Sequence, residues 1–201
     1  FGQPPHLTAL PTALLVKGTA ILLVAAAMIL YPTWYDPYRD CLCEVETVLD
    51  TLQARARAWQ EDRRGYVASG MRLWKRKPLQ GFFGGETRLM FADDPEKAVE
   101  KARPTQRPLM VWAGQEAPGH RAADVPLLRV EDGFVRSCGL GAELTPPLSL
   151  VTDDLGIYYD PTRESRLERL ISASVDLPDH ARARARAVIG RIVEGGLTKY
   201  N

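Results

Sequence analysis

The clearest pattern of apolar and polar positions begins after Cys43, where apolar side chains recur at the spacing of a helix. These positions are Val45, Val48, Leu49, Leu52, Ala56 and Trp59. Acidic side chains come early in this stretch and arginines come late, an order that complements the helix dipole. The pattern predicts an amphipathic helix of about four to five turns, which ends at Gly65.

Short apolar segments follow and alternate with a helical one. Residues 66–69, 87–91, 108–112 and 125–130 have the composition of strands, and residues 95–102 have that of a helix opening on Asp93-Asp94-Pro95. This alternation predicts an α/β domain with a largely parallel sheet. Ligands gather at the carboxyl ends of the strands in such a sheet. The residues that follow each strand are therefore the first candidates for chemistry.

The C-terminal part of the chain combines a turn with two helices. Apolar runs at 148–151 and 157–159 flank Asp153-Asp154-Leu155-Gly156, which predicts a hairpin turn with Gly156 at positive φ. Ser165 and Glu168 have the spacing of a capping box at a helix start. A last helix is predicted over about 179–194, with an apolar face formed by Ala181, Ala185, Val188, Ile189 and Ile192.

The most apolar stretch runs from Ala13 to Tyr31 and contains one charge, Lys17. Its uninterrupted part, residues 20–31, has the length of a buried core helix, which favours a soluble or docked helix over a membrane span. Residues 1–12 are predicted to be an irregular lead-in because they are rich in proline. No charged segment precedes the apolar run, so a cleavable signal peptide is not indicated.

Composition narrows the class of protein. The chain has 201 residues, of which 45% are hydrophobic and 25% charged, as in a globular protein of one domain plus an additional segment. Lys and Arg number 26 and Asp and Glu 25, and the resulting net charge of +1 argues against nucleic acid as a partner. Three cysteines without a C-x-x-C pair argue against a disulfide framework or structural zinc and favour a reducing cytoplasmic setting.

The densest group of chemically capable residues occupies positions 131–141. Glu131 and Asp132 follow an apolar strand and precede Gly133, where an open α/β sheet presents side chains to its ligand crevice. Arg136 can pair with an anionic group. A solvated turn between strand and loop explains the same residues, so composition alone leaves both interpretations open.

Other polar clusters give weaker indications. Asp153 and Asp154 fit a turn better than a metal site. The basic run at 72–77 includes Trp74 and fits an anionic ligand, a nucleic-acid contact or an anionic lipid surface. The arginines within 182–186 are predicted to form a solvated helix face, and the three histidines lack the spacing of metal ligands.

The motif strings of the chain resemble those of a known family. They are EDGFVRSCGLG at 131–141, PPLSLV at 146–151 and GIYYDPTR at 156–163, supported by ILYP at 29–32, YDP at 35–37, WKR at 74–76 and GLTKYN at 196–201. Together they resemble the capsular polysaccharide β-Kdo glycosyltransferases of the KpsC type over about residues 22–201. The resemblance implies two tandem modules of the two-lobed GT-B type. Residues 1–36 would be the tail of an upstream module with the junction, and residues 37–201 the N-terminal lobe of the downstream module.

The same resemblance implies an activity and its partners. The donor would be CMP-Kdo and the acceptor a Kdo-lipid of the phosphatidylglycerol type, handled in the cytoplasm at the inner membrane surface without metal or other cofactor. The fold would be α/β, with a Rossmann-like parallel sheet forming half of a GT-B enzyme after a helical segment. The alternative function is a non-catalytic α/β binding module, or a membrane-associated assembly module in capsule polysaccharide export.

The resemblance also assigns roles to residues of the 131–141 motif. Asp132 would be the catalytic carboxylate of a retaining transfer, and its replacement would leave the fold nearly intact. Glu131 would be a structural or acid/base neighbour. Arg136 would bind the Kdo carboxylate together with Ser137 and Gly139. Arg163 is a further candidate for the same anion.

Overall fold

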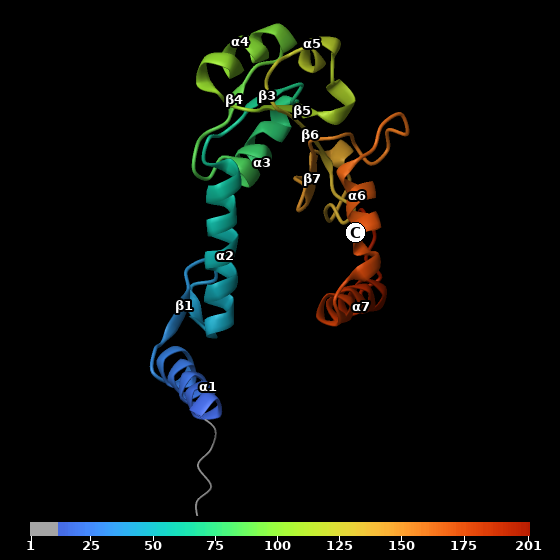
Figure 1. Cartoon of the computed structure of the whole chain (residues 1–201). Helices are drawn as coiled ribbons and strands as arrows, with labels where there is room; N and C mark the ends of the chain where they lie inside the picture. The colour runs from blue at the N-terminus through green and yellow to red at the C-terminus, as the bar shows by residue number, and fades with distance from the viewer. Residues whose placement is uncertain (1–11) are drawn as a thin grey trace, which may run out of the picture. The chain divides into compact units, whose positions relative to one another are not determined.

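A computed structural model describes residues 12–201 of the chain (Figure 1). Contacts divide the chain into two compact units, Phe1–Arg57 and Ala58–Asn201. Helix α2 (Val45–Asp62) begins in the first unit and ends in the second, and it confirms the predicted amphipathic helix. Gly65 follows α2 with φ of 65°. The predicted lead-in, apart from Thr12, lies outside the described residues.

The first unit contains one long helical segment and a small hairpin. Helix α1 (Thr12–Val24) continues into a π-helical stretch, Ala25–Leu30. Strand β1 (Trp34–Asp36) then pairs antiparallel with β2 (Cys41–Cys43). The Asp36 carboxylate accepts hydrogen bonds from the backbone N–H groups of Tyr38 and Arg39, at 2.9 and 3.3 Å. This hairpin was not predicted, because its strands are too short to show an alternating pattern.

The apolar stretch before the hairpin is helical but not buried within this chain. Leu22 is 71% exposed, Leu30 81% and Tyr31 90%. The stretch forms the expected helix, and its described apolar side chains are not covered by any core within residues 12–201. None of the helices in residues 12–201 has both the length and the apolar character needed to cross a bilayer.

The second unit is built on a five-stranded sheet in the order β4-β3-β5-β6-β7. Strands β3 (Val67–Ser69), β4 (Met90–Phe91), β5 (Leu109–Trp112) and β6 (Leu127–Asp132) are parallel to one another, and β7 (Leu150–Asp153) is antiparallel to β6. The strand that follows β3 in the sequence is added on one side of β3, and β5 and β6 are added on the other side. The boundary between β3 and β5 is therefore the topological switch point of the sheet. The predicted α/β class with a Rossmann-like parallel sheet is confirmed.

Helices cover both faces of the sheet (Figure 1). Helix α3 (Leu73–Phe83) joins β3 to β4 and lies on a core that contains Leu79, Met110 and Val130. Helix α4 (Pro95–Thr105) joins β4 to β5 and lies on a second core that contains Ala98, Val99 and Leu109. Neighbouring residues of each strand point to opposite faces. The alternation of Leu109 and Met110 between the two cores follows from this geometry.

Local capping explains where two of the helices begin. The side chain of Asp94 accepts from the N–H of Lys97 at 3.0 Å, with Pro95 in the first turn of α4. Ser165 and Glu168 form the predicted capping box at the start of α6 (Arg166–Ala173). The shorter elements are η2 (Ala113–Gln115), α5 (Pro118–Arg121), η3 (Gly141–Glu143) and η4 (Ser174–Asp176).

The predicted hairpin at 153–156 is wrong. Strand β7 pairs with β6, and residues 157–159 form no strand. The Asp153 carboxylate instead accepts from the N–H groups of Leu155 and Gly156, at 2.8 and 2.9 Å. Gly156 does not have positive φ. A Cβ there would lie 2.8 Å from the carbonyl oxygen of Glu164, so close backbone approach, rather than φ, requires the glycine.

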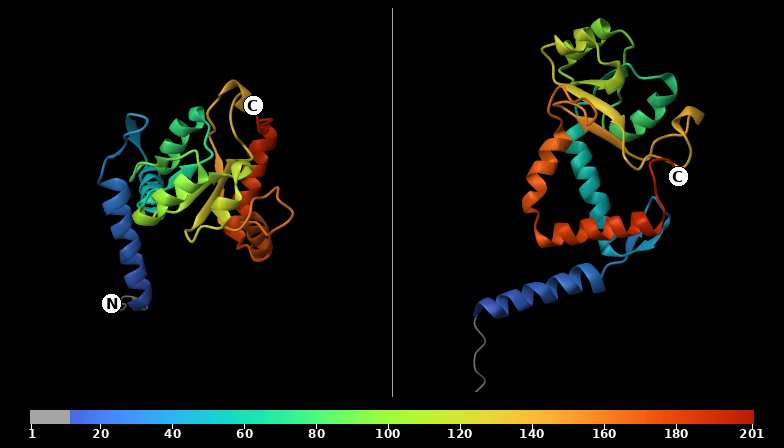
Figure 2. Two further views of the ribbon diagram at one scale, coloured as in Figure 1. Left: turned by 90° about the horizontal axis from the view of Figure 1, so that it is seen from above. Right: turned by 90° about the vertical axis from the view of Figure 1, so that its right-hand side faces the viewer.

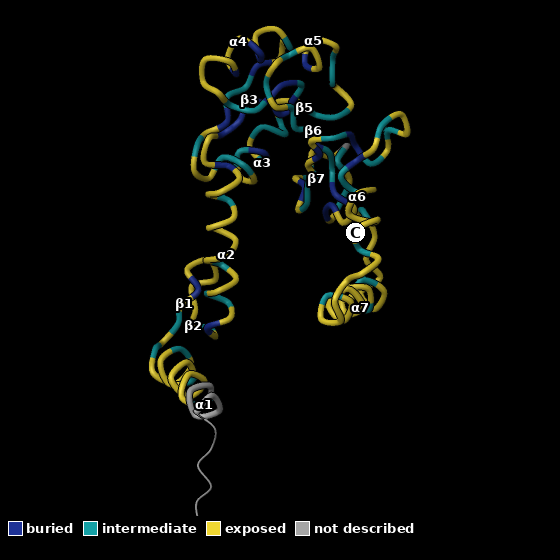
Figure 3. The backbone as a smooth tube through the Cα atoms, viewed as in Figure 1, coloured by how far each residue is buried: buried dark blue, intermediate teal, exposed yellow. Residues whose placement is uncertain are grey.

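The last helix, α7 (Asp179–Glu194), has the predicted bounds, but its apolar face is not buried within the chain. Val188 is 49% exposed and Ile189 60%, and α7 is mostly yellow in Figure 3, in contrast to the dark strands. After α7 the chain returns beside the loops of the sheet (Figure 2). There the N–H of Arg136 donates to the carbonyl oxygen of Lys199, and the N–H of Asn201 donates to that of Ser137.

Candidate functional site

A cavity of about 330 Å³ lies at the carboxyl ends of β3, β5 and β6, next to the switch point of the sheet. This is the position at which open α/β sheets bind their ligands. Its lining contains one carboxylate, two cationic side chains and two indole rings. The lining residues are Gly70, Arg72, Trp74, Lys75, Trp112, Gly114, Gln115, Asp132 and Gly141.

Two glycines allow the backbone to approach closely around this cavity. Gly70 directly follows β3 with φ of 68°, and a Cβ there would lie 2.6 Å from the Cβ of Gln115. A Cβ on Gly141 would lie 3.1 Å from Nη2 of Arg136. Gly70 therefore lets the loop after β3 lie against Gln115, and Gly141 lets the loop after β6 fold onto Arg136; a larger residue would displace either loop.

Asp132, the predicted catalytic carboxylate, is the last residue of β6 and lines the cavity. Its Oδ1 lies 3.0 Å from Nε of Arg136, and the two side chains are 17% and 0% exposed. The strand extends to Asp132, beyond the predicted limit at residue 130. The carboxylate of Asp132 therefore lies between the buried guanidinium and the cavity, where a nucleophile could reach a ligand.

Arg136 lies behind Asp132 and has no exposed surface. Its Nη1 donates to Oγ of Ser137 at 2.7 Å, and that hydroxyl donates to the carbonyl oxygen of Gly139 at 2.8 Å. Nε and Nη2 of Arg136 and Oδ1 of Asp132 are buried and have no hydrogen-bond partner among residues 12–201, so the contact of Arg136 with Asp132 is an ion pair without a hydrogen bond. The structure thus brings Arg136, Ser137 and Gly139 together as a buried support for Asp132. A direct contact of these three residues with substrate stays a prediction.

Glu131 points away from the cavity, because neighbouring strand residues face opposite sides of the sheet. Its Oε1 accepts from the N–H of Asp132 at 3.0 Å, and its Oε2 accepts from Tyr159 at 3.4 Å. Burial, together with the charge of Glu131, raises the pKa of Tyr159 to about 12. Glu131 is not part of the cavity lining within the described chain.

Lys75 is the cation of α3 that lies deepest among the aromatic side chains of the cavity. Its Nζ lies 3.0 Å from the centroid of the Trp112 ring and 5.3 Å from that of Trp74. Burial lowers the pKa of Lys75, and the charges of Asp132 and Glu131 oppose this shift. The ammonium group is therefore held by the faces of two indole rings near the carboxylate of Asp132.

The side chains of the basic run at 72–77 lie in different surroundings. Arg72 and Lys75 line the cavity. Arg76 instead pairs with Asp93 and lies over the ring of Phe91, at 5.1 Å from its centroid. Lys77 is exposed. Helix α3 was not predicted, because this run of charges obscured the apolar positions that face the sheet.

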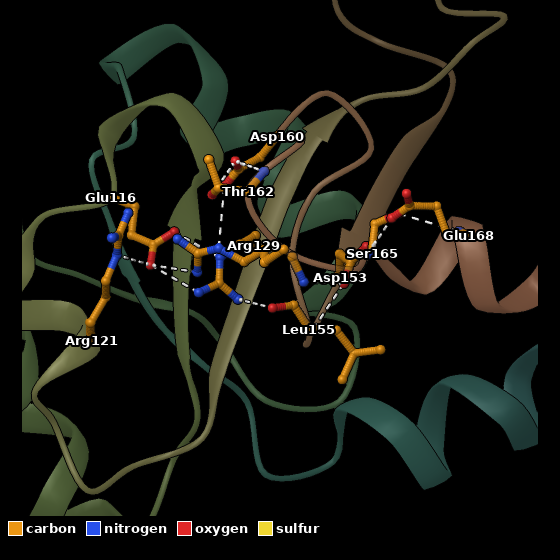
Figure 4. Close-up of polar contacts among 11 residues, drawn as sticks. Glu116, Arg121, Arg129, Asp153, Leu155, Asp160, Thr162, Ser165 and Glu168 are labelled. Carbon is orange, nitrogen blue, oxygen red and sulfur yellow. Dashed lines mark hydrogen bonds and ion pairs between the residues drawn. The ribbon is translucent and has the colours of Figure 1, made fainter.

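Arg163 belongs to a separate ion-pair network around Glu116. Figure 4 shows the centre of this network, where Nε and Nη2 of Arg129 donate to the Glu116 carboxylate at 2.7 and 2.8 Å. Burial raises the pKa of Glu116, but the hydrogen bonds from Arg129 and Arg121 outweigh it and lower the pKa overall. Arg163 lies 3.7 Å from Glu116 and 3.1 Å from Asp160 and is not among the residues that line the cavity.

The acidic pair at 153–154 is occupied by protein groups. Asp153 accepts from the N–H of Arg166 at 2.7 Å, and Asp154 forms an ion pair with the guanidinium of the same residue. The hydrogen bonds from Arg166 lower the pKa of Asp154. The two carboxylates fix the start of α6 against the end of β7, so their proximity has a structural explanation.

Some residues that line the cavity were not predicted as site residues, although the sequence marks them as strand ends. Ser69 is followed by Gly70, and Trp112 is followed by Ala113 and Gly114, so β3 and β5 each end near a glycine, as β6 does. The strand-end argument used for Asp132 therefore applies equally to Gly70, Trp112 and Gly114. The position of Lys75 over Trp112 joins α3 to β5 and had no such signal.

Comparisons with known proteins agree with the motif strings. A family model described as "Capsule polysaccharide biosynthesis protein" matches residues 110–192. The capsule polysaccharide modification protein LipA of Neisseria meningitidis is 34% identical over 183 residues, which cover 89% of this chain and 26% of LipA. The lipopolysaccharide-processing protein LpsZ of Rhizobium meliloti is 35% identical over 72% of this chain and 35% of its own length.

Two solved structures share the fold. The β-Kdo 2,4 transferase of Thermosulfurimonas dismutans KpsC matches with a TM-score of 0.54 and 29% identity over 67% of this chain and 41% of that one. The β-Kdo 2,7 transferase of the same protein matches with a TM-score of 0.51 and 30% identity over 64% of this chain and 42% of that one. The family model, the relatives and these structures together support a KpsC-type capsule protein.

This KpsC-type chain spans 26% of LipA and 35% of LpsZ, well under half of either relative. The family match at 110–192 includes β6, Asp132 and the loop that follows. The match also includes the lining residues of the loop after β5, whereas Gly70, Arg72, Trp74 and Lys75 come from the segment before it, so the complete cavity depends on both segments.

Proposed function

We propose that this KpsC-type chain is part of a glycosyltransferase that transfers Kdo from CMP-Kdo to a Kdo-lipid acceptor in capsule linker synthesis. The observation that carries the proposal is Asp132, a partly exposed carboxylate that lines a cavity at the switch point of the sheet. Buried Arg136 lies 3.0 Å from this carboxylate and positions it. The similarity to two β-Kdo transferases supports the same class of reaction.

The proposed mechanism retains the anomeric configuration through two displacements. An oxygen of Asp132 bonds to the anomeric carbon of Kdo while the bond from that carbon to the phosphate oxygen breaks, and the electron pair leaves with CMP. A hydroxyl of the acceptor then bonds to the same carbon, the carboxylate regains its electron pair, and the hydroxyl proton passes to solvent. Glu131 fits a structural role better than an acid/base role, because its oxygens accept from Asp132 and Tyr159.

Fixed cations suffice to stabilise the departing phosphate, so the proposal includes neither a metal ion nor another cofactor. We infer that the chain supplies the N-terminal lobe of a GT-B module and does not transfer Kdo alone, because a donor in such an enzyme lies between two lobes. The fraction of each relative that it spans supports this inference. The acceptor lipid would bring the enzyme to the cytoplasmic surface of the inner membrane.

The test uses an intact enzyme that contains this chain, incubated with CMP-Kdo and a Kdo-lipid acceptor. Asp132→Asn is expected to lower the transfer rate by ~10³-fold or more, equivalent to about 4 kcal/mol of barrier. Glu131→Gln is the matched control and should retain most of the rate. Wild-type enzyme given CMP-Kdo without acceptor should gain the mass of one Kdo residue on Asp132. Normal turnover by Asp132→Asn with an inactive Glu131→Gln enzyme would identify Glu131 as the carboxylate instead.

A non-catalytic assembly module in capsule export is the second candidate, and the exposed apolar residues of the first unit favour it. Leu22, Leu23 and Leu30 are each more than half exposed. This function predicts that the intact protein associates with inner-membrane vesicles and that Asp132→Asn leaves capsule formation unchanged. Loss of capsule with Asp132→Asn, in protein that still reaches the membrane, excludes it.

A further inference from the structure

An anionic ligand in the cavity beside Asp132 would require a cation that it can contact. Arg136 is not accessible for such a contact. Its guanidinium has no exposed surface and already faces Oδ1 of Asp132 and Oγ of Ser137. Nη2 also lies against Gly141, where even a methyl group would approach it to 3.1 Å. A ligand in the cavity meets Asp132 and Gly141 before it could meet Arg136.

Two other cations line the same cavity. The ammonium group of Lys75 makes no hydrogen bond or ion pair with any residue in 12–201, and its contacts are with the Trp112 and Trp74 rings. The side chain of Arg72 likewise has no ion pair within the described chain. Asp132 is the carboxylate of the lining, so the charges sum to two positive and one negative, a net charge of +1. The three N–H donors of Lys75 are thus free for an anion.

We propose that Lys75, assisted by Arg72, binds the carboxylate of the sugar at this site. The sugar's identity rests on the proposed function, whereas the anion-binding role rests on the cavity alone. In a 2-ulosonic acid such as Kdo, the carboxylate is bonded directly to the anomeric carbon. An attacking Asp132 would therefore approach a second negative charge at close range, and a cation beside both carboxylates offsets their repulsion. Lys75 is attracted electrostatically by Asp132, as this role requires.

The two indole rings fix where this cation lies. An ammonium held 3.0 Å from the Trp112 centroid cannot move freely along its flexible stem. Partial burial strengthens its attraction to an anion, because fewer water molecules compete. Lys75 therefore acts as the specificity-determining residue for an acidic sugar, while Arg136 positions Asp132 from behind.

The experiment measures binding of free Kdo to the 201-residue chain by calorimetry and by NMR of the lysine side chains and indole N–H groups. Wild-type chain is expected to bind Kdo, with shifts at Lys75 and Trp112. Lys75→Met should weaken binding by about tenfold or more, as expected for a lost charge-assisted contact. Lys77→Met is the matched control, because it removes an exposed lysine of the same helix. Asp132→Asn should still bind Kdo, which separates this test from a failure of the catalytic proposal.

Two further ligands distinguish the source of the anion. The reduced C1 alcohol of Kdo lacks the carboxylate. Its affinity should be the same for the wild-type chain and for Lys75→Met. Inorganic phosphate and CMP contain phosphate without a sugar acid, and should lose less affinity than Kdo does in Lys75→Met. The proposal is overturned if Kdo does not bind, if Lys75→Met binds Kdo as wild type does while remaining folded, or if Lys75 governs phosphate binding alone. Lys75→Arg retains the charge and should recover part of the affinity.

Discussion

Asp132 and Arg136 form an ion pair at the end of β6, with Oδ1 and Nε 3.0 Å apart. The aspartate is partly exposed to the cavity, whereas the guanidinium is wholly buried. A buried cation requires a counter-charge, and its removal is strongly destabilising. Asp132 therefore stabilises the fold as well as facing the cavity. The sequence-based expectation that its loss would leave the fold nearly intact took no account of Arg136.

Asp132→Asn should lower the free energy of unfolding by about 3 kcal/mol, because Arg136 would remain buried without its counter-charge. Urea denaturation of the chain measures this loss. Glu131→Gln is the control and should change stability much less, since no buried cation depends on Glu131. Equal stability of wild type and Asp132→Asn would mean that Arg136 is neutralised by another group.

Glu116→Gln should be destabilising by about 3–5 kcal/mol, because it removes the charged partner of buried Arg129. The two side chains are 6% and 7% exposed. The matched control is Glu164→Gln, whose partner Arg169 lies in a pair with both side chains 54% exposed. Exposed pairs contribute less than about 1 kcal/mol, so thermal denaturation should separate the two variants clearly. Equal losses would contradict the role given to burial.

Protonation of His120 should destabilise the fold as the pH falls. Its Nδ1 accepts from the N–H of Ala117 at 3.0 Å, which assigns the proton to Nε2, facing Oγ of Ser69. Burial lowers the pKa of His120, with Glu116 opposing the shift. The unfolded chain then binds the proton more readily, so this contribution is complete above the unfolded pKa of about 6.5 and declines below it.

Denaturation measured from pH 8 to pH 5 tests the sign of this effect. The slope below pH 6.5 should be smaller in His120→Gln than in wild type. His180→Gln, which removes an exposed histidine of α7, should leave the slope unchanged. An identical slope in His120→Gln and wild type would assign the pH dependence to other groups.

Gly156→Ala should destabilise the chain by about 1–3 kcal/mol, as overpacking does. Its new Cβ would lie 2.8 Å from the carbonyl oxygen of Glu164 and 2.9 Å from Cγ of Arg163. Gly190→Ala is the contrasting variant, because nothing lies within 4 Å of a Cβ there. In the interior of α7 this change should stabilise by about 0.5–1 kcal/mol. Thermal melts showing the same sign for both variants would contradict the packing argument.

The sequence predicted those elements whose signals are local. The apolar spacing in α2, the Asp94-Pro95 start of α4 and the Ser165–Glu168 capping box all act within a few residues, and the structure confirms them. The hairpin failed because an aspartate that accepts backbone N–H groups has the same sequence signature whether or not a second strand follows. The Asp153 carboxylate accepts from the N–H of Leu155 in the loop that follows it, and β7 pairs with β6 instead.

The candidate site was predictable to the extent that it lies at strand ends. Asp132 was found because a strand, a carboxylate and a glycine follow one another in the sequence. Burial of Arg136 was not predictable, because arginine is rarely buried unless paired and one segment that packs beside it, residues 199–201, is distant in sequence. The cation–π contact of Lys75 with Trp112 depends on how α3 lies across β5, which no local pattern specifies.

Residues 199–201 form a parallel bridge and backbone hydrogen bonds with residues 136–139. This pairing sets the order in which the region is completed during synthesis. The N–H groups of Arg136, Ser137 and Gly139 have no backbone partners until residues 199–201 have been made, although β6 and its carboxylate are made long before. Closing a loop of this length slows folding. Arg136, the counter-ion of Asp132, therefore reaches its final position only after a segment far from β6 in the sequence has been made.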